Sequence, residues 1–474
     1  MAEESGTTGT SSPLQASFIR NREELVHGVQ ADLRGRLLDI LEAGLERAAP
    51  GSGTRRAVLR DGRVLTIGGR AYDLGAYARV LVLGAGKGSL PIAGALEDIL
   101  GDFLGAGLVV VKKGETRRLG RIRVLEGGHP LPDASSVRAG KALLALARGC
   151  AETDLVLAPV TGGSTSLAVI PQPGLSLADL RRTYDLLLKS GADIREMNIV
   201  RRHLCRLKGG RLVLAAHPAE VVTLSLDTAL PGMPWPDMCL PDPSTFDDAA
   251  ALLRHFHIWE QTPPAVRRFL AQARNAPELE TVKSFSGVKA RLVMVGDPAS
   301  MCRAAAEKAA ALGYSPMVLA SRMHGEARET GICLAGIANE VMARNSPLPP
   351  PCALICSGES PVTIAGQAGT GGPNQELAIS FAARANTDGN WACASIDTDG
   401  TDGPTDVAGG LVDSGVSARA SALGLSFRRI LARHDAGSAL ESLGGRIRTG
   451  HTGTNLQHLR IILIDPPGGR GDAA

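Results

Sequence analysis

The chain has 474 residues, which leaves room for two or three domains, because single hydrophobic cores stop growing near roughly 250–300 residues. Its 44% hydrophobic and 21% charged residues are the balance of an ordinary globular protein and exclude wholesale disorder. The net charge is only +3 and aromatic residues make up 3%, so neither bulk electrostatics nor base stacking favours a nucleic acid or an anionic membrane as partner.

Both ends of the chain are predicted to be disordered tails, over 1–17 and 467–474. The first tail lacks the apolar stretch of a signal peptide, and no apolar run approaches the ~18 residues that a membrane span needs. We therefore expect a cytoplasmic protein without membrane contact. The eight cysteines are scattered with no CxxC pair, which favours reduced packing residues over a disulfide framework or a metal cluster.

Between the tails, strand-like and helix-like segments alternate. Residues 20–49 carry leucine and isoleucine at three- and four-residue spacing, which predicts an amphipathic helix. Over 78–226, short apolar runs alternate with helical patterns, as is typical of a mostly parallel sheet with helices on both faces. Ligands of such sheets bind beyond the carboxyl ends of the strands, so we expect a site in the loops after Val82, Val160 and Ser225.

A proline-rich stretch without periodicity, 227–244, predicts a long irregular loop that serves as a linker or an active-site lid. A second α/β half is expected to begin near Ala290 and to close with the apolar run 459–465. The sequence shows no internal repeat at a fixed period. These patterns predict an α/β protein of two domains.

The first glycine-rich loop, GAGKGS at 84–89, follows a strand and opens a helix. Gly84 and Gly86 let backbone amides approach an anion, and Lys87 at the helix N-terminus is placed to hold a phosphate or a developing charge. The spacing matches neither GxxxxGK[ST] nor GxGxxG. A tight turn with a solvated lysine therefore stays as the alternative.

Two further loops offer donors to an anion. The sequence TGGSTS supplies backbone and hydroxyl donors for a carboxylate or a phosphate, through Gly162, Gly163, Ser164, Thr165 and Ser166. A flexible turn is the alternative. The second is a helical stretch rather than a loop; it carries Asn198 and basic residues and ends near Lys208. Basic residues at the end of a helix also serve as partners of the helix dipole, which is the alternative to a ligand site.

A cluster of aspartates follows an apolar run in IDTDGTDGPTD. Asp397, Asp399, Asp402 and Asp406 fall within ten residues, and carboxylates so close together repel one another unless a cation or donors intervene. The cluster predicts a magnesium site, and Asx-turns in a solvated loop are the alternative. Two polar glycine loops, one with Asn374 and one with Thr452 and Asn455, do not identify a ligand by themselves.

Ten segments in this order resemble the class II glycerate kinase family, from about Arg20 to Ile464. They are GAGKGS (84–89), GGHPLPDASSVRAGKAL (127–143), TGGSTS (161–166), SGADIREMNIVRRHL with LKGGRL (190–212), PDPSTF (241–246), HGEARE (324–329), SGE (357–359), GGPNQELA (371–378), TDGTDGPTD (398–406) and TGTNLQHLRIIL (452–463). One short match means little, but ten in order are specific.

This resemblance implies a Rossmann-like, DUF4147-like N-terminal domain over 18–260, a connecting α/β segment over 261–345 and a smaller α/β MOFRL domain over 346–466. It implies an active site in the cleft between the domains and the phosphorylation of D-glycerate to 2-phosphoglycerate, with ATP and Mg²⁺. The partners are then glycerate and a nucleotide, and a homodimer stays open.

The resemblance also assigns roles to residues. Lys87 is the catalytic lysine, and Asp399 and Asp402 are expected to hold the metal. The expected substrate and phosphate contacts are Gly84, Gly86, Gly162, Gly163, Ser164, Thr165, Ser166, Asn198, Lys208, Ser225, Glu359, Asn374, Thr452 and Asn455.

The chain departs from the family pattern at several places, among them the lost SGPT turn before 241, Cys356 in the SGGE segment and His434 before Asp435, and two further departures bear most on catalysis. Leu226 replaces the acidic residue that usually follows the serine at 225, and Pro373 stands where the family commonly has arginine in GGRNQE. Two alternatives to a kinase therefore remain: a hydroxypyruvate reductase, a name often attached to family members, and a paralogue with an altered substrate or no catalysis. Hydride transfer favours a dinucleotide fingerprint, which GAGKGS lacks.

Overall fold

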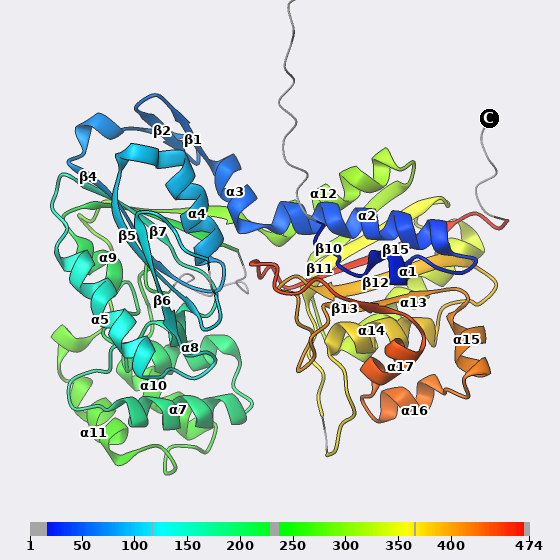
Figure 1. The fold of residues 1–474 in the computed structure, drawn as a ribbon. Helices are drawn as coiled ribbons and strands as arrows, with labels where there is room; N and C mark the ends of the chain where they lie inside the picture. The colour runs from blue at the N-terminus through cyan, green and yellow to red at the C-terminus, as the bar shows by residue number, and fades with distance from the viewer. Residues whose placement is uncertain (1–16, 116, 228–236, 365, 469–474) are drawn as a thin grey trace, which may run out of the picture.

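The computed structural model describes residues 17–115, 117–227, 237–364 and 366–468. Most of the two expected tails, and 228–236 of the expected irregular loop, lie outside the described residues. The described chain forms two lobes side by side, each built around its own six-stranded sheet (Figure 1). Within this part of the chain, no helix is both long and apolar enough to cross a membrane.

The first lobe is built on a parallel sheet in the order β6-β5-β4-β7-β8-β9. The strands are β4 (Arg79–Ala85), β5 (Leu104–Lys112), β6 (Ile122–Gly127), β7 (Asp154–Pro159), β8 (Glu220–Leu226) and β9 (Ala290–Gly296), and each neighbouring pair is parallel. In chain order this is 3-2-1-4-5-6, the order of a doubly wound Rossmann-like sheet. The predicted fold class is confirmed.

The central strands β4, β7 and β8 are buried on both faces of the first sheet, because they are continuous apolar runs. Along β4, Val80 and Val82 join one hydrophobic cluster while Leu81 and Leu83 join another. The helices of this lobe are α3 (Pro50–Ala57), α4 (Ser89–Leu100), α5 (Ala134–Arg148), α6 (Ser164–Leu167), α7 (Leu177–Lys189), α8 (Ile194–His203), α9 (Arg211–Ala216), α10 (Phe246–His255) and α11 (Pro264–Ala273). A small antiparallel sheet of β1 (Val58–Asp61), β2 (Val64–Ile67) and β3 (Arg70–Asp73) completes it.

The second lobe has a mixed sheet in the order β10-β11-β15-β12-β13-β14. Its strands are β10 (Ser315–His324), β11 (Cys352–Glu359), β12 (Asn390–Asp397), β13 (Gly409–Asp413), β14 (Arg446–Ile447) and β15 (His458–Asp465). Only β10 and β11 pair in parallel; the other pairs are antiparallel.

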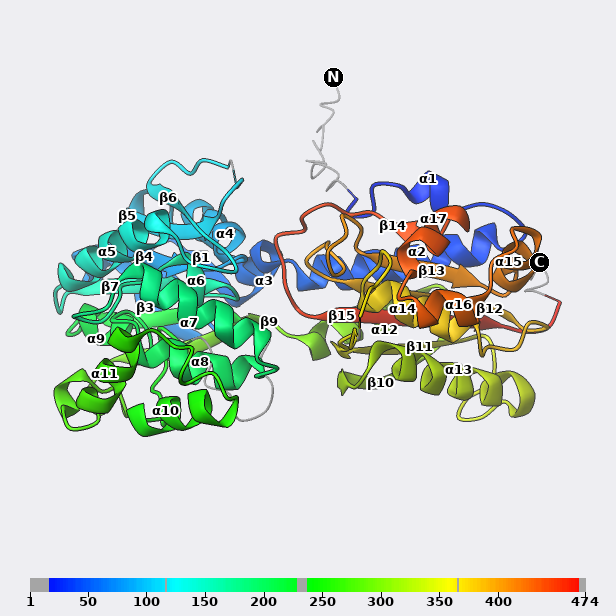
Figure 2. The same cartoon turned by 90° about the horizontal axis from the view of Figure 1, so that it is seen from below.

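Helices cover both faces of this second sheet (Figure 2). Ile461 and Leu463 of β15 join the cluster on the side of α2 and α12, whereas Ile462 and Ile464 join the cluster on the opposite side. The helices are α1 (Arg22–Leu25), α2 (Ala31–Ala48), α12 (Pro298–Ala311), α13 (Ala327–Arg344), α14 (Pro373–Ala382), α15 (Val416–Ala422), α16 (Phe427–Ala432) and α17 (Ala436–Ser442).

Two elements cross the domain limits expected from the sequence. Strand 290–296, expected to open the second half, pairs with β8 and completes the first sheet. Helix 31–48, expected in the first domain, packs on α12 and β15 of the second lobe. Neither periodicity nor spacing specifies which sheet an element joins, since its apolar face only requires a partner face. The domain limits themselves remain a prediction.

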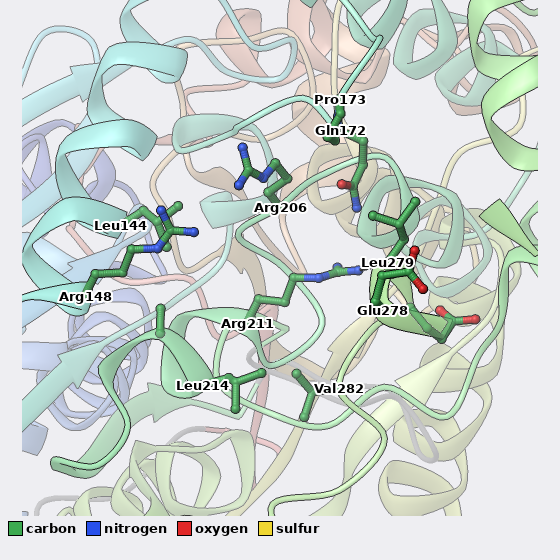
Figure 3. Close-up of a pocket in the computed structure, with 12 residues that line it drawn as sticks. Leu144, Arg148, Gln172, Pro173, Arg206, Arg211, Leu214, Glu278, Leu279 and Val282 are labelled. Atoms are coloured by element: carbon green, nitrogen blue, oxygen red, sulfur yellow. Dashed lines mark hydrogen bonds between the residues drawn. The ribbon is translucent and has the colours of Figure 1, made fainter. Parts of the chain in front are cut away.

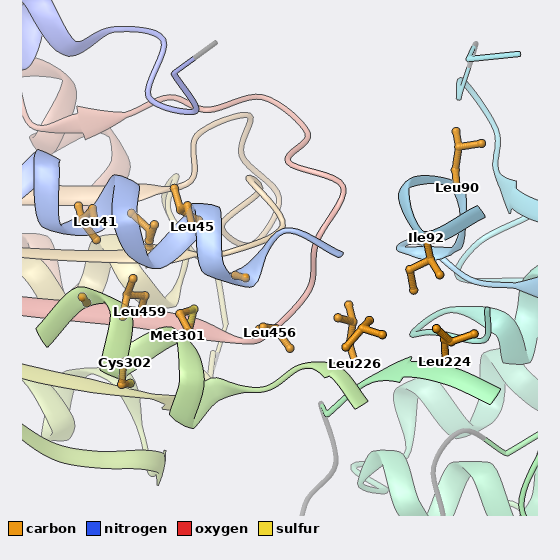
Figure 4. Packing of buried hydrophobic residues seen from close by; sticks show 14 of the residues in the cluster. Leu41, Leu45, Leu90, Ile92, Leu224, Leu226, Met301, Cys302, Leu456 and Leu459 are labelled. Carbon is orange, nitrogen blue, oxygen red and sulfur yellow. The ribbon is translucent and has the colours of Figure 1, made fainter. Parts of the chain in front are cut away.

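One hydrophobic cluster continues from one lobe into the other (Figure 4). Leu226, at the end of β8, and Leu456, just before β15, are both fully buried. A Cβ atom added at Gly296 would lie 3.0 Å from Leu226 and 3.4 Å from Leu456, so these two side chains meet at the same glycine. Leu226, a departure from the family pattern, therefore lies in the apolar seam between the lobes.

Candidate active site

The first wall of the site lies where the order of the parallel sheet reverses. β4 and β7 are neighbours, and the loops that follow them carry GAGKGS and TGGSTS. The Lys87 amide donates to the Gly162 carbonyl at 2.8 Å, which joins the two loops. Gly86 has φ +144°, and a Cβ there would overlap the Thr161 hydroxyl. Glycine at 86 thus lets the loops meet, with Lys87 at the mouth of the switch point.

The second wall lies at one edge of the mixed sheet. Strand register sets His324 beside Glu359, and Asp397 beside His458. His458 is also within one position of Glu359, because it pairs with Gly358. The ends of β10, β11 and β12 therefore bring acidic and imidazole side chains together, although they are far apart in the sequence.

Between the walls is a cavity of about 830 Å³. From the first lobe its lining residues are Lys87, His129, Gly162, Gly163, Thr165, Asp193, Ile194 and Asn198, and from the second they are His324, Gly325, Glu326, Glu359, Pro361, Asp397, Asp399, Asn455 and Gln457. The cavity is thus formed jointly by the two lobes.

A charge pair joins the two lobes at the edge of the cavity. The Lys87 Nζ atom lies 3.4 Å from Asp399 Oδ2, and the two side chains are 27% and 17% exposed. Asp399 is held in place through its other oxygen, which accepts from the Thr401 amide at 2.9 Å and the Thr401 hydroxyl at 2.7 Å. Lys87 and Asp399 also line a small adjoining cavity together with Lys112 and His451. The pair lies between two spaces that a ligand can enter.

The first-lobe wall is cationic. Burial, and then the charges of Lys87, Lys112 and Arg201, lowers the pKa of His129 to about 4. His129 is therefore neutral near pH 7. Of these cations, Lys87 lines this cavity and Lys112 lines the small adjoining one, so an anionic ligand is favoured beside Lys87.

The second-lobe wall is acidic. Burial, and then the carboxylate of Asp399, raises the pKa of Asp397 well above its ordinary value. Burial also raises the pKa of Glu359. Burial, followed by the charge of Arg460, lowers the pKa of His458 to about 3, so this histidine adds no positive charge near pH 7. A cation between these carboxylates would relieve their repulsion.

Eight of the expected site residues line the cavity: Lys87, Gly162, Gly163, Thr165, Asn198, Glu359, Asp399 and Asn455. Asn198 is 1% exposed and its Oδ1 atom has no hydrogen-bond partner within the described chain. An unpaired buried acceptor in a cavity lining is suited to a ligand hydroxyl.

Asp402 does not face the cavity. Its carboxylate accepts from the backbone and side-chain amides of both Asn374 and Gln375, at 2.9–3.0 Å. Asn374 Oδ1 in turn accepts from Ser395. Both oxygens of Asp402 are thus occupied at the start of α14, which leaves no opening for the metal role expected of it, and Asn374 serves the same structural network.

The remaining expected residues also lie off the cavity lining. Gly84 packs against Pro159, and Ser225 donates to the Val160 carbonyl at 2.7 Å, so both fasten neighbouring strands. Thr452 donates to the Thr398 carbonyl. The others outside the lining are Gly86, Ser164, Ser166 and Lys208, all of which are buried.

The sequence reasoning missed several lining residues. His129, His324 and Gln457 lie inside segments that carried the family resemblance, so a signal for them was present. Asp193 also lies inside such a segment, and it caps α8 by accepting from the Arg195 and Glu196 amides. Ile194, Gly325 and Glu326 lie inside such segments as well, whereas Pro361 lies outside them.

Glycine loops at the switch point of a parallel sheet, facing an acidic wall across one cavity, define a two-lobed α/β enzyme for anionic substrates. A family model described as a domain of unknown function (DUF4147) matches residues 36–271, and the MOFRL family model matches residues 352–458.

Individual relatives agree with these models. The glycerate 2-kinase of Pyrococcus horikoshii is 35% identical, covering 91% of this chain and 99% of the relative. A putative hydroxypyruvate reductase of Agrobacterium vitis is 38% identical, covering 81% and 99%. The crystal structure of glycerate kinase from Thermotoga maritima superposes with a TM-score of 0.79 at 32% identity, covering 91% of this chain and 99% of that one. The chain belongs to the class II glycerate kinase family.

Proposed function

We propose that this enzyme transfers the γ-phosphoryl group of ATP to D-glycerate and forms 2-phosphoglycerate. The kinase names of its relatives support this reaction. The observation that carries the proposal is the approach of Lys87 from one lobe to Asp399 of the other, at 3.4 Å, beside a shared cavity. Phosphoryl transfer depends on positioning and on neutralising charge, and both walls provide for that.

Lys87 neutralises the transferring phosphoryl group in this proposal. Its loop is fixed by the hydrogen bond from its own amide to Gly162, so its ammonium group needs little rearrangement to reach a phosphate.

Mg²⁺ fits the opposite wall. No group of three or more histidine, cysteine, aspartate or glutamate side chains in the described chain forms a metal cage. Magnesium is, however, commonly held by one or two carboxylates together with substrate phosphates. Asp397 and Asp399 supply two such carboxylates, and the raised pKa of Asp397 reflects burial first and then the repulsion from Asp399, which a cation would relieve. When bound there, Mg²⁺ would neutralise phosphate charge.

Glycerate is assigned to the part of the cavity lined by Gly162, Gly163, Thr165 and Asn198. The unpaired Asn198 Oδ1 atom is available to accept from a glycerate hydroxyl, and the cations near His129 attract the carboxylate. A hydroxyl fixed in this way is oriented for attack on the phosphoryl group.

A hydroxypyruvate reductase is the competing reaction, because relatives carry that name. Dinucleotide-binding sheets of this order usually have an acidic residue at the end of the second strand, which binds the ribose hydroxyls. Here that strand, β5, ends on Lys112. A lysine does not bind the ribose hydroxyls of NADH in this way, whereas a basic residue can accept the 2′-phosphate of NADPH, so this strand end argues against an NADH-dependent reductase.

One assay separates the reactions. Purified protein is supplied with D-glycerate and Mg-ATP, ADP release is followed, and the phosphorylated carbon is identified by ³¹P NMR; a parallel sample receives hydroxypyruvate with NADH or NADPH. We expect glycerate-dependent ADP release and 2-phosphoglycerate. Nicotinamide oxidation without ADP release would replace the kinase by the reductase, and no turnover in either sample would point to a paralogue without these activities.

A further inference from the structure

A second cavity, of about 400 Å³, lies on the first lobe and shares no lining residue with the interlobe cavity. It is formed by α5, α9, the chain at 172–173 and 278–282, and Arg206. Figure 3 shows the guanidinium groups of Arg148, Arg206 and Arg211 around this space. We call it the arginine pocket.

Two of its three arginines are not engaged. Arg148 and Arg206 are exposed, and within the described chain neither side chain has a hydrogen bond or an ion pair. Arg206 is close enough to Arg211 for its charge to contribute, after burial, to lowering the pKa of Arg211. The pocket lining holds three arginines against the two carboxylates of Glu278 and Glu280, and the two arginines without a hydrogen bond or ion pair are available to an anion.

Arg211 differs from the other two, because it is fixed. Its Nη1 atom donates to the carbonyls of Arg202, Cys205 and Lys208 at 3.1–3.3 Å, and its Nη2 atom donates to the Leu279 carbonyl at 2.5 Å. Arg211 therefore offsets the partial negative charge of the carbonyl groups at and beyond the C-terminal end of α8. That end would otherwise repel an anion.

The rest of the pocket selects for more than a bare ion. Leu144, Leu214 and Val282 supply apolar walls. Glu278 lies on the side away from Arg148 (Figure 3), and Glu280, which also lines the pocket, is already bound to His203 at 2.9 Å. The pocket lining thus combines three arginines, apolar side chains and two glutamates, and the part around Arg148 and Arg206 suits a small organic anion with a carbon skeleton.

The arginine pocket is connected to the interlobe cavity through α8. Residues of the pocket hold the C-terminal end of this helix, through Arg211 and through the bond of Glu280 to His203. The N-terminal half of the same helix supplies Ile194 and Asn198 to the cavity. The helix spans about 15 Å at 1.5 Å per residue. A ligand at one end can therefore shift residues at the other.

We propose that the arginine pocket is a binding site for a small carboxylate or phosphate monoester, and that its occupancy stabilises α8 and so adjusts the interlobe cavity. Arg148 and Arg206 bind the anionic group. This inference does not depend on the reaction catalysed, because both of its readouts are measurements of binding and helix protection.

The test uses phenyl phosphate and inorganic phosphate as probes and calorimetric titration as the readout. All proteins carry Lys87→Ala, which weakens phosphate binding in the interlobe cavity. We compare this background with Arg148→Ala/Arg206→Ala added and with the control Arg268→Ala/Arg303→Ala, which removes two exposed helical arginines outside both cavities. We expect phenyl phosphate to bind more tightly than inorganic phosphate, and the pocket variant to lose at least about tenfold in affinity.

Hydrogen exchange tests the connection. Saturating phenyl phosphate should slow exchange of the α8 amides in the Lys87→Ala background and in the control, but not in the pocket variant. Equal affinity in the pocket variant and the control, or no binding in either, would overturn the site. Binding that leaves α8 exchange unchanged would overturn the connection to the cavity.

Discussion

The two walls of the interlobe cavity differ in backbone structure and in charge. The first-lobe wall consists of glycine turns after parallel strands, where backbone amides and cations gather around Lys87 and His129. The second-lobe wall consists of strand ends in a mixed sheet, where Glu359, Asp397 and Asp399 gather. The first wall is suited to an anion and the second to a cation. The difference supports the proposal above, in which each lobe supplies half of a site for a phosphate ester with its cation.

Removing the cation from the first wall is expected to have the largest effect and tests the contrast between the walls most strongly. Lys87→Ala should lower kcat by about a thousandfold, because one preorganised charge on a transition state is worth roughly 10²–10³ or more. Glycerate turnover with the ADP readout measures it, and circular dichroism checks the fold. The control Lys289→Ala removes a lysine that is 56% exposed and paired with Glu152. Wild-type kcat in Lys87→Ala would remove the lysine from the mechanism.

The seam that holds the walls together is the next target. Leu226→Ala should lower the free energy of unfolding by roughly 3–4 kcal/mol, because it opens a cavity in the apolar cluster shared by the lobes. Urea denaturation measures the loss. Leu214→Ala, at a position 49% exposed, serves as the control and should change stability little. Equal effects at the two positions would show that Leu226 is not part of a shared core.

The pH dependence of stability tests the cationic wall without a substrate. The pKa of His129 is lowered from 6.5 to about 4, so the unfolded chain binds more protons than the folded one between these values. Stability should therefore rise with pH over this window, and His129 should account for about 3 kcal/mol between pH 4 and pH 7. In His129→Gln the difference in unfolding free energy between pH 4 and pH 7 should shrink by about that amount. An unchanged difference would contradict the burial of a neutral imidazole.

The acidic wall is tested by two neighbouring aspartates with different surroundings. Asp399→Asn should lower kcat by about a hundredfold and raise the Mg²⁺ concentration needed for half activity, because it removes a carboxylate of the cavity. Asp402→Asn should instead lower the free energy of unfolding by roughly 2 kcal/mol, since it disturbs the four hydrogen bonds at the start of α14. A larger change in Mg²⁺ requirement for Asp402→Asn than for Asp399→Asn would reverse the assignment.

The same comparison shows what sequence reasoning reaches. Strand, glycine loop and helix follow one another within a few residues in GAGKGS, so local patterns indicated this loop as a candidate, and Lys87 lies in the cavity lining. Its role in catalysis stays a prediction. The second wall depends on register between strands far apart in the sequence, which sets His324 beside Glu359. No local pattern specifies such pairing.

The aspartate loop shows the limit at single residues. Asp399 and Asp402 are three positions apart and have the same chemistry, yet one lines the cavity and the other is enclosed by donors of α14. Only tertiary contacts distinguish them. The placement of helix 31–48 on the second lobe likewise depends on which apolar face it meets.

The central claim is that Lys87 and Asp399, from different lobes, act on the same phosphoryl group. A double-mutant cycle measured by single-turnover transfer from radiolabelled ATP to glycerate tests it, because residues that act as a unit are not additive. We predict that Lys87→Ala/Asp399→Asn is about as slow as the slower of the two single variants. Rate losses that multiply, as for independent residues, would contradict the account.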